Sequence, residues 1–385
     1  MKKIQLSIIA TLAMGIATTS SATSLNEALT NGKVSGEVTA TYEKRDFNQE
    51  SNAYYSNTAY SVGSFALKYE TAVWNNLQLT SKFRAYGTIY EDDDDSITGT
   101  GTGDASERFK EKNGTNNSVD LENMFLQYNT DVVTVTAGRQ AIRTDWINQL
   151  HDAIKIDANF KNTSIEAIWS LRQGRVYARE YFPMTKINED KGVYKLGLTQ
   201  KYDNISVTAY ALVMPDVKDI FGAKTNLKID DTTIRAQYAI SQDDADSDKD
   251  SSVIDLKVAT TLSGFNPFIG LIKVDSDADF PGYSQGSGET IVPFEEGDYI
   301  YKKDAQTIYA GVSKTFGDLS ATLLYGNTKY DQGAESLTLN ETTIWAGYKI
   351  VDNLTTNVGL THVDEDNKST VSDYDQINLT VTYSF

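Results

Sequence analysis

Arginine is concentrated in one part of this 385-residue chain. The sequence contains nine arginines, of which five lie between residues 139 and 179. These five are Arg139, Arg143, Arg172, Arg175 and Arg179. An arginine side chain stays charged in any environment and offers planar donors to carboxylates, so arginines facing acids across a water-filled space would orient small polar solutes. The alternative is that these side chains are solvated loop charges.

Two acidic stretches have the spacing of a hard-cation site. Asp244, Asp246 and Asp248 occupy alternate positions, and so do Asp275, Asp277 and Asp279. Carboxylates at alternate positions are typical of calcium loops, although neither stretch has the glycine and glutamate of an EF-hand. Calcium is therefore a candidate ligand of both stretches, with solvated loop charge as the favoured alternative. The run of four aspartates at 92–95 is read as solvated charge.

Catalytic chemistry has few candidate residues. The chain has two histidines, His151 and His362, and only His151 is followed by an acid, Asp152. Ser164 or Ser170 would have to act as the nucleophile. Adjacent residues on a strand point to opposite faces, so His151 and Asp152 are poorly placed to act as base and orienting acid. A hydrolase stays an alternative that this geometry disfavours.

Composition excludes further classes. The chain has no cysteine, which rules out thiol chemistry and cysteine-ligated metals. It has 53 acidic against 35 basic residues, a net charge of -18, whereas a nucleic-acid partner requires a basic surface. The 23 tyrosines and 14 phenylalanines favour strands, and the 5 prolines are few enough to allow them.

The first residues have the order of a secretory signal. Lys2 and Lys3 precede an apolar stretch over 4–17, and small residues follow up to Ala22. We expect a signal peptide at 1–22 and one folded domain at 23–385. No later stretch is long and apolar enough for a spanning helix, so a membrane form of the mature chain would have to be a closed barrel.

Alternation with period two dominates the rest of the chain. Residues 377–385 place Ile377, Leu379, Val381, Tyr383 and Phe385 on one face and polar side chains on the other. One face in lipid and one in a wet lumen, with a terminal aromatic at the boundary, gives this pattern. Similar runs occur at 132–137, 154–158, 165–171, 205–212, 232–240, 319–325 and 342–350.

Short polar turns alternate with long polar stretches. The turns include 74–76, 130–131, 161–162, 203–204, 317–318 and 352–353, and the long stretches are 91–117, 172–191, 241–251, 275–304 and 363–372. The pattern predicts an all-β fold, a single transmembrane antiparallel β-barrel with short periplasmic turns and long extracellular loops. Splitting 224–240 at Asp230-Asp231 gives an even count of 18 strands; 16 is the alternative because 224–229 is short.

Both ends of the chain and one interior motif resemble a porin family. Residues 25–36, residues 137–144 and the terminal Phe385 are similar to the OprD-type outer membrane porins and to the major outer membrane porins of campylobacter-like bacteria. The resemblance implies an 18-stranded diffusion channel, usually trimeric, whose third loop folds inward. Only short motifs match, so the solute preferences of the substrate-specific members cannot be carried over.

An inward third loop, at 140–151, would set the pore width. Alternation places Lys155 and Asp157 opposite Ile154 and Ile156, and Arg235 opposite Ile234, so these charges would face the channel. The predicted constriction residues are Arg139, Arg143, Asp145, Asp152, Lys155, Asp157, Arg172, Arg175, Arg179 and Arg235. Phe385 is the predicted barrel-closure residue.

The combined interpretation is a non-enzymatic outer membrane porin for passive diffusion of ions and small hydrophilic solutes. The alternatives are a barrel hydrolase and a substrate-specific channel. We expect outer membrane lipid and lipopolysaccharide as surroundings, a homotrimer as the assembly, no nucleic acid, and no cofactor other than calcium at the acidic loops. Acidic loops at the mouth predict mild cation selectivity that fades as salt rises.

Overall fold

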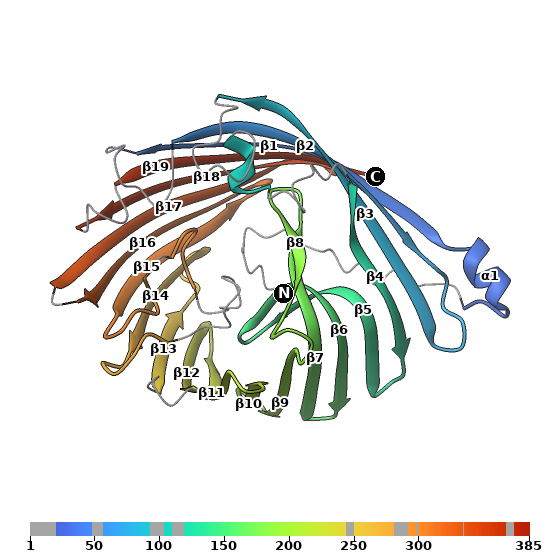
Figure 1. Ribbon diagram of the computed structural model, residues 1–385, viewed down its shortest axis with the longest axis horizontal. Helices are drawn as coiled ribbons and strands as arrows, with labels where there is room; N and C mark the ends of the chain where they lie inside the picture. Colours follow the sequence, from blue (N-terminus) through green and yellow to red (C-terminus); the bar gives the residue numbers. More distant parts are fainter. Residues whose placement is uncertain are drawn as a thin grey trace.

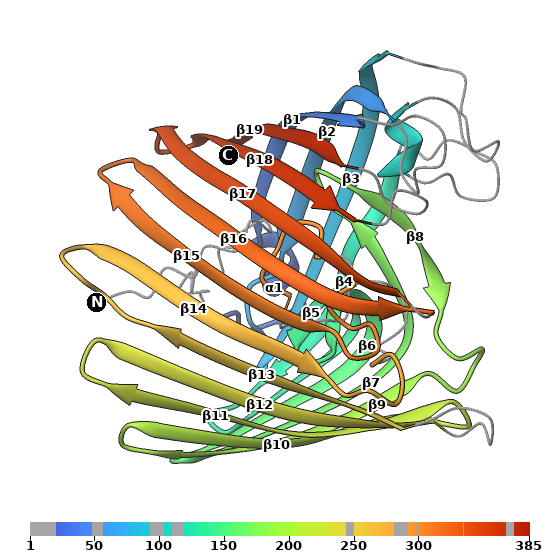
Figure 2. The ribbon, with the colours of Figure 1, turned by 90° about the vertical axis from the view of Figure 1, so that its left-hand side faces the viewer.

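The computed structural model describes residues 21–47, 57–92, 104–109, 119–243, 250–280, 292–297, 299–333, 335–366 and 373–385. They form a short N-terminal helix and one large sheet that closes on itself (Figures 1 and 2). The predicted signal peptide and Asp244, Asp246 and Asp248 lie outside these residues, apart from residues 21 and 22. Within the described part of the chain, no helix has the length and apolarity needed to cross a membrane.

The helix α1 spans Leu25–Thr30, and a 3-10 turn η1 spans Asp104–Glu107. The strands are β1 (Lys33–Phe47), β2 (Thr58–Glu70), β3 (Leu77–Glu91), β4 (Val119–Asn129), β5 (Val133–Thr144), β6 (Ile147–Phe160), β7 (Thr163–Val176), β8 (Tyr181–Lys186), β9 (Val193–Tyr202), β10 (Ile205–Met214), β11 (Lys218–Ile229), β12 (Thr232–Asp243), β13 (Ser251–Ala259), β14 (Phe265–Val274), β15 (Gln306–Phe316), β16 (Leu319–Gln332), β17 (Glu335–Val351), β18 (Leu354–Glu365) and β19 (Tyr374–Ser384).

Eighteen of the described strands form the barrel wall, each antiparallel to its neighbours. The nineteenth, β8, pairs with the end of β7 only, while β7 continues the wall by pairing with β9. The predicted barrel with 18 strands is therefore confirmed. The break at Asp230-Asp231 is correct too, because β11 ends at Ile229 and β12 begins at Thr232.

The last strand closes the barrel against the first. β19 pairs with β1 from Glu37 opposite Ser384 to Phe47 opposite Tyr374. Gly36 and Phe385 extend this seam through two backbone hydrogen bonds of 2.9 and 3.0 Å. A Cβ at position 36 would overlap the Phe385 ring, so glycine makes room for the aromatic, which stacks on Phe65 with 6.3 Å between ring centroids.

The two faces of the wall differ in chemistry. Exposed apolar side chains cover the outer face, while buried polar and charged side chains dominate the inner face. Exposed aromatics stand on the outer face near the short turns, at Tyr128, Phe160, Tyr202, Phe316, Tyr348 and Phe385. An apolar outer band with aromatics at its edge suits a barrel in lipid, because aromatic rings prefer the interface between hydrocarbon and water.

The predicted short turns lie at one end of the barrel. They connect β2 to β3, β4 to β5, β6 to β7, β9 to β10, β15 to β16 and β17 to β18. The long connections follow the strands that run toward the opposite end. Three connections at that end are short as well, those from β5 to β6, from β10 to β11 and from β16 to β17.

Candidate pore constriction

The hairpin of β5 and β6 leaves the wall and turns into the barrel (Figure 1). Pairing of β4 with β5 ends at Arg139, next to Gly138. Gly138 has a φ of 124°, and a Cβ there would collide with the Met124 carbonyl oxygen. A residue without a Cβ therefore permits the bend. We call residues 139–152 the inward hairpin.

The tip of the inward hairpin reaches the inner face of β10 and β11. Trp146 is completely buried, and its indole N–H donates to the Tyr210 hydroxyl over 2.8 Å. Its ring also packs against Phe280 and Tyr301, at 5.0 and 6.0 Å between centroids. The Lys224 ammonium pairs with both oxygens of Asp145 at 2.6 and 2.7 Å. The third loop thus folds inward, although it consists mainly of strand with a two-residue turn rather than a long loop.

A second hairpin, formed by the end of β7 and by β8, extends over the lumen from the part of the wall next to β6 (Figure 1). We call residues 172–186 the strap hairpin. The Tyr181 hydroxyl donates to Asp120 of β4 over 2.8 Å, which joins the strap to the wall where β5 has left it. Arg175 pairs with Glu180 at 2.7 Å and lies 4.7 Å from the Phe182 ring centre. The strap is therefore held close to its turn, both to the wall and between its own two strands.

Residues 292–297 form a third inward element, which we call the inner segment. Glu341 of β17, completely buried, accepts backbone N–H bonds from residues 295, 296 and 297 at 2.9, 3.3 and 3.1 Å. The Thr343 hydroxyl donates to the same carboxylate over 3.1 Å. One wall carboxylate thus holds the inner segment in the lumen.

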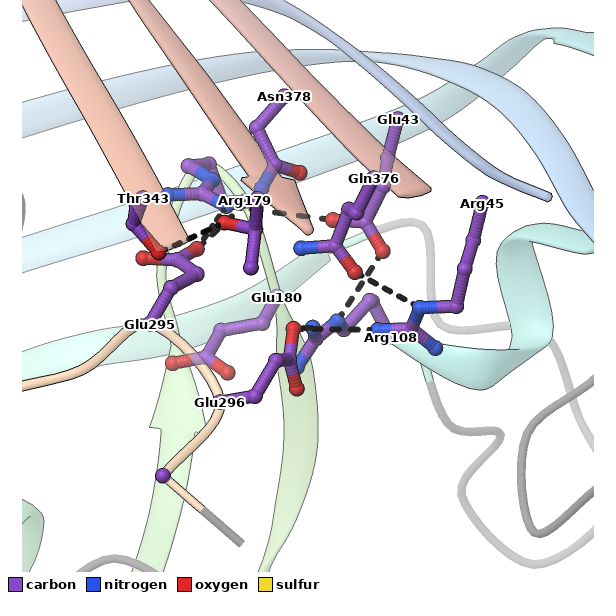
Figure 3. A network of polar contacts seen from close by, with 12 residues as sticks. Glu43, Arg45, Arg108, Arg179, Glu180, Glu295, Glu296, Thr343, Gln376 and Asn378 are labelled. Atoms are coloured by element: carbon purple, nitrogen blue, oxygen red, sulfur yellow. Dashed lines mark hydrogen bonds and ion pairs between the residues drawn. The ribbon is translucent and has the colours of Figure 1, made fainter. Parts of the chain in front are cut away.

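A charged network joins these elements to the first strand (Figure 3). Arg179, in the turn of the strap hairpin, pairs with Glu295 at 3.0 Å and lies 3.9 Å from Glu43. Arg108 pairs with Glu43 at 3.3 Å and with Glu296 at 3.2 Å. Three elements distant in sequence therefore meet at one charged cluster.

Arg45 completes this network from the wall. Its guanidinium donates to Gln376 over 2.7 Å and pairs with Glu296 at 3.3 Å. Burial alone would raise the pKa of the Glu296 carboxyl, but Arg108 and Arg45 outweigh burial and hold that pKa below its ordinary value. The cluster contains three arginines and three glutamates, so its charges largely compensate one another.

The inner face of β1–β4 carries a separate set of ion pairs. Arg84 pairs with Glu122 at 2.9 Å and also contacts Glu37. Lys82 pairs with Glu122 at 2.8 Å and with Glu37 at 3.4 Å. Because these groups neutralise each other, the wall is polar without a strong charge of one sign.

The predicted pore residues occupy several places. Arg139 pairs with Asp152 at 2.8 Å and donates to the Leu121 carbonyl over 3.0 Å, so it holds the base of the inward hairpin. The side chains of Arg143 and Arg172 are exposed. Asp145, Arg175 and Arg179 lie in the inward elements described above. Their role in conduction stays a prediction.

The remaining predicted pore residues lie on the wall. Lys155 pairs with Asp157 at 2.6 Å, on the face opposite the exposed Ile154 and Ile156. Arg235 pairs with Asp255 of the neighbouring strand. These three charges therefore lie on the inner face, each with a partner.

The described part of the acidic loops engages protein groups. Asp275 accepts the backbone N–H groups of Ser252 and Asp277, and Asp279 pairs with Lys302 at 3.0 Å. Among the described residues, no three His, Cys, Asp or Glu side chains are grouped so that they could hold a metal ion. Calcium binding by these loops stays a prediction.

His151 and Ser170 form a pair that the sequence suggested only as a remote alternative. The Nδ1 atom of His151 lies 2.8 Å from the Ser170 hydroxyl oxygen, and the ring tautomer decides which of the two donates the hydrogen bond. The Nε2 atom of the same ring lies 2.8 Å from the Asn148 carbonyl oxygen. Both side chains are completely buried, and Asp152 pairs with Arg139 instead. Ser170 is closed off from solvent, and the acid expected to orient His151 is engaged elsewhere. We therefore interpret the His151–Ser170 pair as a packing contact and not as a catalytic one.

Sequence reasoning missed most of the central network. It did not identify Glu43, Arg45, Arg108, Glu295, Glu296 or Glu341. The alternation in β1 would have indicated Glu43 and Arg45, because they occupy the same alternate, inward-facing positions as Thr39 and Thr41. No local pattern marks Arg108 or the inner segment, since their contacts come from residues 65 to 251 positions away.

Comparisons with known proteins agree with this architecture. Residues 1–168 match the family model of the Campylobacter major outer membrane protein. No curated protein sequence matches the chain.

Solved structures of several bacterial proteins share the fold. OccAB3 of Acinetobacter baumannii has a TM-score of 0.75 at 13% identity, covering 92% of this chain and 99% of its own. OccK3 (OpdO) of Pseudomonas aeruginosa has a TM-score of 0.74 at 12% identity, covering 94% of this chain and 97% of its own. OccK8 (OprE) of Pseudomonas aeruginosa has a TM-score of 0.72 at 14% identity, covering 92% of this chain and 98% of its own. The resemblance to OprD-type outer membrane porins, close to the Campylobacter major outer membrane protein, is thus confirmed.

Proposed function

We propose that this protein is an outer membrane porin, whose barrel carries ions and small hydrophilic solutes by passive diffusion. Barrels of 16–18 strands leave an aqueous channel unless side chains or loops fill it. The observation that carries the proposal is the contrast between an apolar outer face and an inner face of paired charges. Such a wall can be wet inside and in contact with lipid outside.

The inward elements give this channel its narrow part. The inward hairpin, the strap hairpin and the inner segment all project from the wall. One ion pair joins the strap hairpin to the inner segment, and another joins the inward hairpin to the wall at β11. Paired charges offer alternating donors and acceptors to a hydrated solute. We infer that the constriction sorts solutes by size and polarity more than by net charge.

The charge outside the constriction sets a mild cation preference. Without the predicted signal peptide the chain carries a net charge of -20, since Lys2 and Lys3 are removed. Charges on wide, wet loops act over about 8 Å at physiological ionic strength, and over less as salt rises. The preference will therefore fade at high salt.

Single-channel recording in a planar bilayer tests the function. The purified full-length protein should give stepwise conductance, with a reversal potential on the cation side in a low-salt gradient. Insertion of folded barrel without any conductance would contradict a porin. A hydrolase would instead show turnover of ester or lipid substrates, which the burial of His151 and Ser170 disfavours.

The resemblance to trimeric porins supports a homotrimer. Light scattering of the purified protein in detergent, corrected for detergent mass, should give three chains per particle. A monodisperse particle with one chain would contradict the trimer.

The acidic loops suit contact with lipopolysaccharide through divalent ions. Chelation of divalent ions should therefore release bound lipopolysaccharide from the protein.

A further inference from the structure

A lysine stands on the outer face of the barrel, near the end that carries the short turns. Lys314 belongs to β15, and alternation places its side chain on the same face as Ile308 and Phe316, which are 51% and 53% exposed. The turn at Gly317 and Asp318 follows, so the Lys314 Cα lies about 10 Å along the strand from that turn. A charged side chain thus lies close to the edge of the apolar band.

Two aromatic rings contact the Lys314 ammonium. Phe265 lies directly opposite on β14, and its ring centre is 3.6 Å from Nζ, while the ring centre of Phe316 is 4.8 Å away. Both rings are exposed on the outer face. A ring face attracts a cation but covers only the side that it contacts. The two contacts therefore hold the charge at the level of the outer aromatic side chains, where hydrocarbon meets headgroups.

Lys314 has no carboxylate partner among the residues that the structure describes. Other lysines near the short turns do have one. Lys68 pairs with Glu70 at 2.8 Å, and Lys349 pairs with Asp352 at 2.6 Å. A cation that faces lipid is unfavourable unless it reaches water or an anion. The position of Lys314 therefore calls for an anion from the surroundings of the barrel.

The wall beside this ammonium is apolar and partly lined by small side chains. Ala321 of β16 lies directly opposite Lys314, on the side away from Phe265, and Ala346 of β17 lies directly opposite Ala321. Leu319 and Leu323, both exposed, border Ala321 along β16, which runs next to β15 in Figure 2. This surface offers room and apolar contact to a hydrocarbon chain next to the charge.

We propose that Lys314 binds the headgroup phosphate of a glycerophospholipid whose acyl chains lie over Ala321 and its leucine neighbours. A phospholipid brings both matching parts, a phosphate at the level of the aromatic rings and hydrocarbon for the adjacent apolar wall. The short turns are expected on the periplasmic side, where phospholipids form the leaflet of an outer membrane. The site faces lipid and not the lumen, so it acts independently of conduction.

Lipid retention by the purified folded protein, measured by native mass spectrometry, tests the proposal. The two probes are dioleoylphosphatidylglycerol and dioleoylglycerol, which has the same chains without the phosphate. Wild type should retain the phospholipid much more strongly than dioleoylglycerol. Lys314→Gln should weaken the apparent Kd of the phospholipid about fivefold, the effect of one lysine near a membrane surface, and Lys314→Arg should keep the wild-type value.

Lys228→Gln is the matched control, because Lys228 is an exposed lysine near a short turn of β11, next to the outward-facing Ile229 but on the opposite face. It should leave phospholipid retention unchanged. Inorganic phosphate at the concentration of the lipid should not displace the phospholipid, since it lacks the acyl chains.

An unchanged Kd in Lys314→Gln would overturn the proposal, and so would displacement by inorganic phosphate. A changed oligomeric state in Lys314→Gln with unaltered lipid retention would assign the residue to a contact between copies of the chain and also overturn it. If Lys314→Gln does not fold, the two lipids on wild type decide, and equal retention of both refutes the site.

Discussion

Replacing Glu341 by glutamine should release the inner segment and widen the channel. The Glu341 carboxylate holds backbone N–H groups of three consecutive residues and the Thr343 hydroxyl. In Glu341→Gln, an NH₂ group replaces one carboxylate oxygen. This NH₂ group faces the N–H or O–H donors whose hydrogen bonds that oxygen accepted. The variant therefore loses at least one charge-assisted bond and weakens the others.

The size of this effect follows from ordinary hydrogen-bond energies. A hydrogen bond to a charged group contributes about 1.5–3 kcal/mol, and a buried donor left without a partner costs about 1–3 kcal/mol. A loss of about 2–4 kcal/mol shifts the equilibrium toward release of the inner segment roughly 30- to 700-fold. Glu295 and Glu296 would move with it, which loosens their pairs with Arg179 and Arg108.

Single-channel conductance measures the result. Glu341→Gln should conduct more than wild type and show larger current fluctuations. Glu335→Gln is the matched control, because Glu335 lies at the exposed start of the same strand. Unaltered conductance and noise in a folded, heat-modifiable Glu341→Gln barrel would refute the idea that this carboxylate holds the constriction.

Four further results are expected. Deleting Phe385 should strongly reduce folded barrel in the outer membrane, because it removes the two backbone bonds to Gly36 and the stack on Phe65; wild-type levels of heat-modifiable protein would argue against its closing role. Replacing Arg139, Arg143 and Arg172 together by glutamine should move the reversal potential further toward cations and alter conductance; no change in either would favour solvated loop charges. Because the folded pKa of Glu296 is depressed, its ion pairs are intact above the ordinary glutamate pKa of about 4.3 and are lost as pH falls through the lower folded value, so conductance at pH 7 and pH 5 should agree and differ only in stronger acid. On intact cells, a protease or epitope probe should reach 241–251 but not Asp203-Asn204 or Asp352-Asn353; labelling of the latter pairs would reverse the orientation.

Local patterns in the sequence predict the barrel wall well. Alternation reports which face meets lipid, and this is why Ile154, Ile156 and Ile234 are exposed on the outer face as predicted. Strand count followed from turn residues, since the doublet Asp230-Asp231 can be read as a turn without knowledge of any partner.

The inward elements are beyond such local patterns. The position of the third loop was predicted from resemblance, but its strand character was not, because β5 and β6 keep pairing with each other after they leave the wall. The inner segment was read as exposed loop, and its place depends on Glu341, 44 to 46 residues away. Only a contact map across the lumen reveals that dependence.

The central claim is that the inward hairpin crosses the lumen to the wall at β11, and cross-linking across that contact tests it most directly. The chain has no native cysteine, so Asp145→Cys with Lys224→Cys introduces the only two thiols. A short bismaleimide should join them within one folded chain, detected as a linked peptide after proteolysis, with either single variant as control. A folded double variant whose two thiols react separately and never become linked would contradict the account.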